Sequence, residues 1–307
     1  MLSKALFHAL AASRPLERLA SRYGMAPGGF ARRFVAGETV AEAIEVGRAL
    51  QARGFLLTLD QLGERVSTLD EADAASRAYV RTAAEVVASG IERNLSVKLS
   101  QLGLHLDPAV CTDNLRRILM AAAPQGFFVR VDMEESSTVD TTLAIVKTLR
   151  EQGFDELGVV LQSALYRSEQ DLARMLELRV RVRLVKGAYK EPKPVAYQKK
   201  RDVDAAYERM MRRLMTEGNY PALATHDPVL IQRARQFASS RGIGPDRFEF
   251  QMLYGVRRDL QTALLSEGCR VRVYLPFGRE WFPYYMRRLG ERPANLAFVV
   301  RSLLRER

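Results

Sequence analysis

The chain has 307 residues, of which 47% are hydrophobic, and it carries a formal net charge of +11 at pH 7. These values are ordinary for a globular protein with a sizeable core, and no stretch reaches the roughly 18 apolar residues that a membrane-spanning helix needs. The positive charge suits a lipid surface or an acidic ligand, but there is no helix-turn-helix signature, zinc-finger spacing or basic block interleaved with aromatics, so we expect no nucleic-acid partner.

The first segment, residues 1–53, has helical periodicity and precedes the first strand, so we expect an N-terminal helical arm. Its beginning contains a short apolar stretch, residues 5–12, that weakly resembles an export signal. We favour a surface helix instead, because the apolar pattern continues through Leu16, Leu19 and Tyr23.

Eight short apolar runs rich in β-branched residues come next. They cover residues 55–59, 95–99, 127–131, 157–161, 180–185, 222–224, 248–251 and 271–275. The segments between them have helical periodicity, as at Leu115, Ile118 and Leu119. Strands separated by helices pair in parallel through right-handed crossovers, and eight such units in succession close into a barrel. We therefore expect an α/β fold, a (β/α)8 TIM-like barrel over residues 54–292. An open doubly wound sheet is the alternative, but no G-x-G-x-x-G follows the first strand.

The last segment, residues 293–307, has the pattern of an amphipathic helix. Its apolar stripe is Leu296, Val299, Val300, Leu303 and Leu304. We expect this helix to pack on the barrel, and binding to an anionic membrane is the alternative. The cysteines, Cys111 and Cys269, belong to no motif, which is typical of a reducing compartment. The expected location is cytoplasmic, with a peripheral position at the inner face of the membrane as the alternative.

Polar side chains occur at or near the end of almost every predicted strand. They are Asp60, Glu64, Lys98, Arg130, Asp132, Gln162, Arg183, Lys186, Thr225, His226, Asp227, Glu249, Gln251 and Tyr274. The carboxyl ends of the strands carry the active site in barrels of this type. No nucleophile motif is present, and His226 has no partner histidine at metal-ligand spacing. Cations and hydrogen-bond donors predominate, which suits a phosphate-bearing cofactor and a carboxylate substrate.

Two adjacent arginines, Arg287 and Arg288, lie in a helix predicted to begin at about residue 280. Neighbouring helical residues point about 100° apart, so the two guanidinium groups could flank one bound group. Arginine matches carboxylates in bidentate fashion. Solvated surface arginines are the alternative interpretation.

The motifs in this order resemble those of proline dehydrogenase. They are L-D-Q-L-G-E at 59–64, S-V-K-L-S at 96–100, V-R-V-D-M-E at 129–134, V-V-L-Q at 159–162, R-L-V-K-G-A-Y at 183–189, A-T-H-D at 224–227, F-E-F-Q-M-L-Y-G at 248–255, Y-L-P-F-G at 274–278 and R-R-L-G-E-R-P-A-N at 287–295. The resemblance is to the short monofunctional bacterial type. It implies a distorted barrel that binds FAD without a covalent bond, with FMN as the alternative flavin.

The resemblance also implies roles for individual residues. The cofactor-binding group is Met133, Gln162, Arg183, Lys186, Gly187, Ala188, Thr225, His226, Glu249 and Gln251. The substrate-binding group is Lys98, Arg287 and Arg288 for the carboxylate, and Tyr189, Leu253 and Tyr274 for the ring. Asp132 and Arg183 are expected to act in catalysis, with Arg183 beside the flavin N5 atom. Glu64 is similar to the family's gate residue, which pairs with the first arginine of the last helix.

The implied reaction is oxidation of L-proline to pyrroline-5-carboxylate, the first step of proline catabolism to glutamate. A hydride passes to the flavin, and the electrons pass to a membrane quinone. A pyrroline-5-carboxylate dehydrogenase is a further expected partner. The competing enzyme class is a Schiff-base aldolase, because Lys98 and Lys186 lie at strand ends. Such an enzyme needs a lysine with a depressed pKa.

Overall fold

The computed structural model describes residues 24–26, 29–63 and 65–291, with side chains as far as Met286. Eight parallel strands form a closed barrel in sequence order. They are β1 (Leu56–Gln61), β2 (Asn94–Val97), β3 (Phe128–Val131), β4 (Leu157–Gln162), β5 (Arg181–Val185), β6 (Ala222–Ala224), β7 (Glu249–Leu253) and β8 (Val271–Phe277). The barrel closes where β8 pairs with β1, from Leu56 opposite Arg272 to Gln61 opposite Phe277. The predicted (β/α)8 barrel is confirmed.

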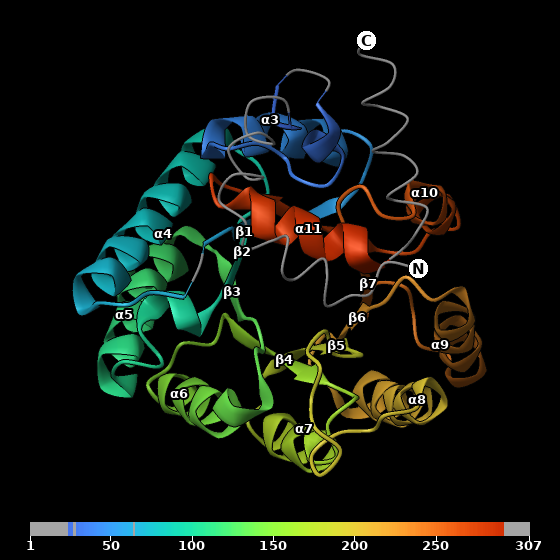
Figure 1. The fold of residues 1–307 in the computed structure, drawn as a ribbon. Helices are drawn as coiled ribbons and strands as arrows, with labels where there is room; N and C mark the ends of the chain where they lie inside the picture. The colour runs from blue at the N-terminus through green and yellow to red at the C-terminus, as the bar shows by residue number, and fades with distance from the viewer. Residues whose placement is uncertain (1–23, 27–28, 64, 292–307) are drawn as a thin grey trace.

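Helices follow every strand and surround the barrel (Figure 1). They are α4 (Leu69–Ser89), α5 (Pro108–Ala122), α6 (Val139–Glu151), α7 (Ser168–Glu177), α8 (Lys200–Glu217), α9 (Pro228–Arg241), α10 (Arg258–Ser266) and α11 (Trp281–Glu291), with α3 (Val40–Gln51) before β1. Local sequence sets their starts: Thr68 and Glu71 form a capping box at α4, and Asp227 caps α9 ahead of Pro228.

Helix α3, which precedes the barrel, occupies the outer position expected of the helix after β8. Helix α3 lies against β1 and β8, since a Cβ on Gly47 would lie 3.1 Å from Leu57 Cδ1 and 3.9 Å from Leu275 Cδ2. Helix α11 instead packs its Trp281 and Tyr285 in a separate apolar cluster with residues near the N-terminal end of the described chain. Figure 1 shows α11 inside the ring of outer helices. This exchange places α11 over the barrel mouth, and the fold is a distorted version of the regular barrel.

The interior of the barrel is polar. Hydrogen bonds cross it between strands that are not neighbours, as from Arg183 of β5 to Ser96 of β2 at 3.0 Å and to Gln251 of β7 at 2.5 Å. Barrel interiors are normally filled by branched aliphatic side chains. The polar interior therefore indicates that the barrel core itself supports the site.

Three of the polar residues expected at the barrel mouth lie deeper than the sequence predicts. Arg130 and Glu249 are buried within the barrel, and Tyr274 is in the middle of β8 because that strand continues to Phe277. Inward-facing side chains alternate along a strand, so a residue two positions earlier lies about 7 Å deeper. The sequence pattern gives the face of a residue but not this depth.

Several predictions concern residues beyond the described part of the chain. The beginning of the N-terminal arm (1–23), Glu64 and the C-terminal helix (293–307) lie outside it, and so do the side chains of Arg287 and Arg288. The helix expected from about residue 280 is present as α11. Within residues 24–26, 29–63 and 65–291, no helix is long and apolar enough to cross a membrane.

Candidate active site

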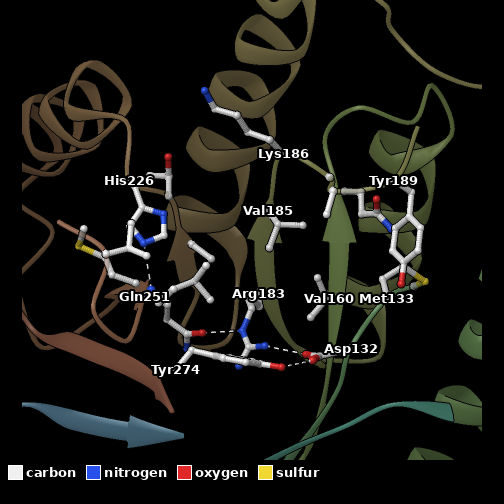
Figure 2. Close-up of a pocket in the computed structure, with 18 of the residues that line it drawn as sticks. Asp132, Met133, Val160, Arg183, Val185, Lys186, Tyr189, His226, Gln251 and Tyr274 are labelled. Carbon is white, nitrogen blue, oxygen red and sulfur yellow. Dashed lines mark hydrogen bonds and ion pairs between the residues drawn. The ribbon is translucent and has the colours of Figure 1, made fainter. Parts of the chain in front are cut away.

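A cavity of about 830 Å³ opens at the carboxyl ends of the strands. Its lining includes many of the residues singled out from the sequence: Lys98, Asp132, Met133, Gln162, Arg183, Lys186, Gly187, Ala188, Tyr189, Thr225, His226, Gln251, Leu253 and Tyr274. Figure 2 shows Arg183, Asp132 and Tyr274 together at its base, with Lys186 at the opposite end. Glu249 is not part of this lining. The structure thus brings most of the predicted site together around one pocket.

Asp132 is the centre of the hydrogen-bond network at the pocket base. Arg183 donates from Nη1 to Asp132 Oδ1 at 2.7 Å, and the Tyr274 hydroxyl donates to Asp132 Oδ2 at 2.6 Å (Figure 2). The guanidinium carbon of Arg183 lies 5.2 Å from the centroid of the Tyr274 ring, close enough for a cation–π interaction. Burial and the nearby carboxylates raise the pKa of Tyr274 well above its ordinary value. The Tyr274 hydroxyl therefore stays protonated and serves as a donor.

Lys98 is paired with Asp60, which the sequence placed among the polar residues at the strand ends but without a specific role. Its Nζ lies 2.5 Å from Asp60 Oδ1, 3.2 Å from the Tyr274 hydroxyl and 3.5 Å from Asp132 Oδ2. Burial lowers the pKa of Lys98, but the charges of Asp60 and Asp132 outweigh burial and raise it above its ordinary value. Lys98 is therefore a fixed cation. This property contradicts the aldolase alternative, which needs a lysine that is readily neutral.

The pairing of Asp60 with Lys98 could have been identified from their positions. Asp60 is one residue before the end of β1 and is paired in register with Ser96, two residues before Lys98. Neighbouring parallel strands that end at the same level bring the side chains at their carboxyl ends together. A carboxylate that is almost fully buried normally requires a cation partner, and Lys98 is the nearest one in the strand order.

Lys186 at the pocket rim is held between two carboxylates. Its Nζ lies 2.6 Å from Asp204 Oδ1 and 2.8 Å from Asp227 Oδ2. Lys200 also lies 3.2 Å from Asp227. Burial raises the pKa of Asp227, but hydrogen bonds from Lys186 and Lys200, the charge of Lys186 and the backbone N–H of Val229 outweigh burial and lower the pKa to about 2. Lys186 is therefore held in ion pairs with two carboxylates, an arrangement that does not suit the free amine of Schiff-base chemistry.

The backbone after β5 approaches the pocket closely at Gly187. Its φ is +116°, and a Cβ there would lie 2.9 Å from Gln162 Oε1. The conformation and the space both require glycine. Gln162 is itself fixed, because its Nε2 donates to the backbone oxygen of Glu134 at 2.7 Å. The pocket wall formed by these residues is rigid and exposes main chain to a ligand.

His226 is oriented by the strand next to it. Its Nε2 accepts a hydrogen bond from the backbone N–H of Leu253 at 2.9 Å. A histidine that accepts at Nε2 carries its ring proton on Nδ1. Among the described residues, no cluster of histidine, cysteine and carboxylate groups could hold a metal ion. The site therefore offers charges, hydrogen-bond donors and an apolar wall.

Comparison with known proteins agrees with this geometry. The family model described as proline dehydrogenase matches residues 43–301. The chain is 44% identical to the proline dehydrogenase of Deinococcus radiodurans over 279 residues, which is 90% of each chain. It is 38% identical to proline dehydrogenase 1 of Bacillus subtilis over 301 residues, covering 98% of this chain and 99% of the relative.

The fold is similar to that of larger solved structures. The crystal structure of proline utilization A from Bdellovibrio bacteriovorus matches with a TM-score of 0.79 and 26% identity over 85% of this chain. The match covers 32% of that protein, so the chain spans about a third of its length.

Proposed function

The chain belongs to the proline dehydrogenase family and is an enzyme that oxidises proline, and we propose that it does so by transferring a hydride to FAD bound in the barrel-mouth pocket. The observation that carries this proposal is the network of Lys98, Asp132, Arg183 and Tyr274 at the pocket base. It combines fixed cations with a protonated hydroxyl. That combination suits an electron-accepting ring that gains negative charge, with Lys98 as one of several cations that would hold an amino-acid carboxylate beside it.

The residues present fit a flavin in size and chemistry. The cavity volume lies within the usual range for cofactor sites, about 300–1,000 Å³. Met133, Val160 and Val185 supply apolar wall, and Arg183 and Lys186 supply positive charge. A bound flavin would supply the hydride acceptor, a chemistry that amino-acid side chains lack. The other proposed cofactor contacts are Gln162, Gly187, Ala188, Thr225, His226 and Gln251.

The remaining residues of the site would bind and orient the substrate. Lys98, together with Arg287 and Arg288 of α11, would bind the proline carboxylate. Leu253 and the rings of Tyr189 and Tyr274 would pack against the pyrrolidine ring. Asp132 would hold Tyr274 and Arg183 in place through its two carboxylate oxygens. Glu64 would act as a gate by pairing with Arg287. Holding the reacting carbon against its acceptor in this way contributes proximity to the rate.

We also propose a membrane quinone as the electron acceptor and a pyrroline-5-carboxylate dehydrogenase as the consumer of the product. Both extend the family resemblance, and the net positive charge supports transient contact with an anionic membrane surface. A cytoplasmic location, with peripheral binding at the inner membrane face, follows from the same reasoning.

The decisive experiment is an anaerobic titration of the purified protein with proline. We expect a yellow protein, or one that becomes yellow with added FAD, and bleaching of the flavin absorbance as proline is added. Chromatography of the released cofactor separates FAD from FMN. A protein that takes up no flavin, or that keeps its colour under excess proline, would overturn the proposal. Reduction of a soluble quinone in the same assay tests the acceptor separately.

A further inference from the structure

A buried ion pair lies below the pocket and has no role in the proposed reaction. Glu249 begins β7 and Arg272 is in β8, and their side chains are 1% and 7% exposed. Arg272 donates from Nε to Glu249 Oε1 at 2.7 Å and from Nη2 to Oε2 at 2.9 Å. It also lies 2.6 Å from Glu92 Oε1. Charged side chains are almost never fully buried unless they are paired, and barrel interiors are normally filled by branched aliphatic side chains. Packing alone therefore does not explain a bidentate ion pair at this position.

The side-chain amide of Gln251 connects this pair to the pocket. Gln251 donates from Nε2 to Glu249 Oε1 and accepts at Oε1 from Arg183 Nε at 2.5 Å. A carboxylate only accepts hydrogen bonds, and a guanidinium only donates them. Only one of the two amide orientations therefore satisfies both neighbours. In the reverse orientation, oxygen would face oxygen and N–H would face N–H.

Arg183 depends on this amide for one side of its guanidinium group. Its other hydrogen-bond partners among the described residues are Asp132, directly after β3, and Ser96 on β2, which contact Nη1 and Nη2. Gln251 provides the contact at Nε from β7. Without a fixed amide, the hydrogen bonds that hold the guanidinium would come only from the side of β2 and β3, beside the ring of Tyr274.

We propose that Glu249 is a positioning residue: paired with Arg272, it holds the Gln251 amide in one orientation, and this amide holds the Arg183 guanidinium at the pocket base. The inference rests on the proposed function, because its consequence concerns the flavin. It also gives Glu249 a different role from the direct cofactor contact that the family resemblance implies. Arg183 supplies a positive charge that favours the reduced, more negative flavin. Displacing this charge lowers the midpoint potential.

The charges of the pair are permanent. Burial raises the pKa of the Glu249 carboxyl, but the charge and hydrogen bonds of Arg272 outweigh burial and keep the pKa below its usual range. Burial lowers the pKa of Arg272, and Glu249 and Glu92 together raise it above its ordinary value. The amide orientation is consequently the same across the working pH range.

The test measures the midpoint potential of bound FAD by equilibration with a redox dye. In Glu249→Gln the new amide can donate as well as accept, so residue 249 no longer selects one orientation of Gln251, and only the contact with Arg183 still does. The double variant Glu249→Leu/Arg272→Leu removes both buried charges of the pair, and Glu92, which loses Arg272, is 26% exposed and can be hydrated. In both variants we expect the ratio of reduced to oxidised flavin to fall about tenfold, which is about 30 mV for a two-electron couple. We also expect FAD to bind more weakly.

A control separates this effect from loss of stability. Asp171 of α7 is buried and accepts from Arg167 Nε at 2.7 Å, and it does not line the pocket. Asp171→Asn should lower the thermal midpoint and leave the flavin potential unchanged. A wild-type potential in both Glu249 variants would overturn the inference while leaving the proposed function intact. A wild-type protein that takes up no FAD would instead refute the proposed function.

Discussion

Replacing Lys98 with methionine would leave a buried carboxylate without its cation. Lys98 Nζ lies 2.5 Å from Asp60 and 3.5 Å from Asp132. Asp132 keeps its ion pair with Arg183 at 2.7 Å, so the loss falls mainly on Asp60. Removing one partner of a buried ion pair costs about 3–5 kcal/mol. Because the Lys98 side chain is 22% exposed, we expect the lower value, about 3 kcal/mol.

The size of this destabilisation should depend on pH. Burial raises the pKa of Asp60, and Lys98 is the main group that opposes burial. In the variant, the folded-state pKa of Asp60 therefore rises further above its unfolded value. A carboxyl whose pKa is raised by folding binds more protons in the folded state, so its cost is absent below the unfolded-state pKa, grows as pH rises from there to the folded-state pKa, and stays constant above it. We expect a smaller loss of stability at pH 5 than at pH 8.

Urea unfolding of the wild-type and Lys98→Met proteins at these two pH values measures the effect. At pH 8 the thermal midpoint should also fall by about 5 °C, given an unfolding entropy of about 2.1 cal/mol/K per residue. Lys147→Met is the matched control, since Lys147 is 59% exposed and lies 3.8 Å from Glu151. It should change stability by less than about 0.5 kcal/mol. A loss of equal size at both pH values, or no loss, would refute the reasoning.

Four further substitutions test the site. Arg287→Ala and Arg288→Ala should each lose roughly 2–5 kcal/mol of binding energy for proline, seen as a higher KM, while flavin content stays at the wild-type level. Steady-state kinetics and absorbance measure the two effects. An unchanged KM in either variant would exclude that arginine from carboxylate binding. Arg183→Ala should shift the flavin spectrum and lower its midpoint potential, and a spectrum identical to wild type would argue against its place beside the flavin. Gly187→Ala should weaken FAD binding and lower stability by about 1–3 kcal/mol, because the φ of +116° strains any L side chain and the new Cβ meets Gln162. Fluorescence titration with FAD measures the change in affinity. A wild-type affinity would show that the backbone at residue 187 does not contribute to FAD binding.

Sequence periodicity predicted the strands because each is a short apolar run bounded by helix-length segments. It also located the barrel mouth, since residues such as Asp132 and Lys186 directly follow strands β3 and β5. It did not predict depth within the barrel, so Glu249 was expected at the mouth although it begins β7 near the opposite end. Depth depends on the stagger between neighbouring strands, which no local pattern encodes. The sequence also did not predict that α3, and not α11, occupies the outer position between β8 and β1, because both helices have apolar stripes.

The pairing of charges in the pocket explains why the substrate would need cations from outside the barrel. Lys98 is already engaged by Asp60, and Arg183 by Asp132. A proline carboxylate would therefore add negative charge to a base whose cations are largely neutralised, and an unpaired buried charge is unfavourable. The fold places α11 over the mouth, and the arginine pair follows Met286 in that helix. On this argument the barrel supplies a balanced floor, and the proposed binding of the anionic substrate would depend on α11, whose expected outer position α3 occupies.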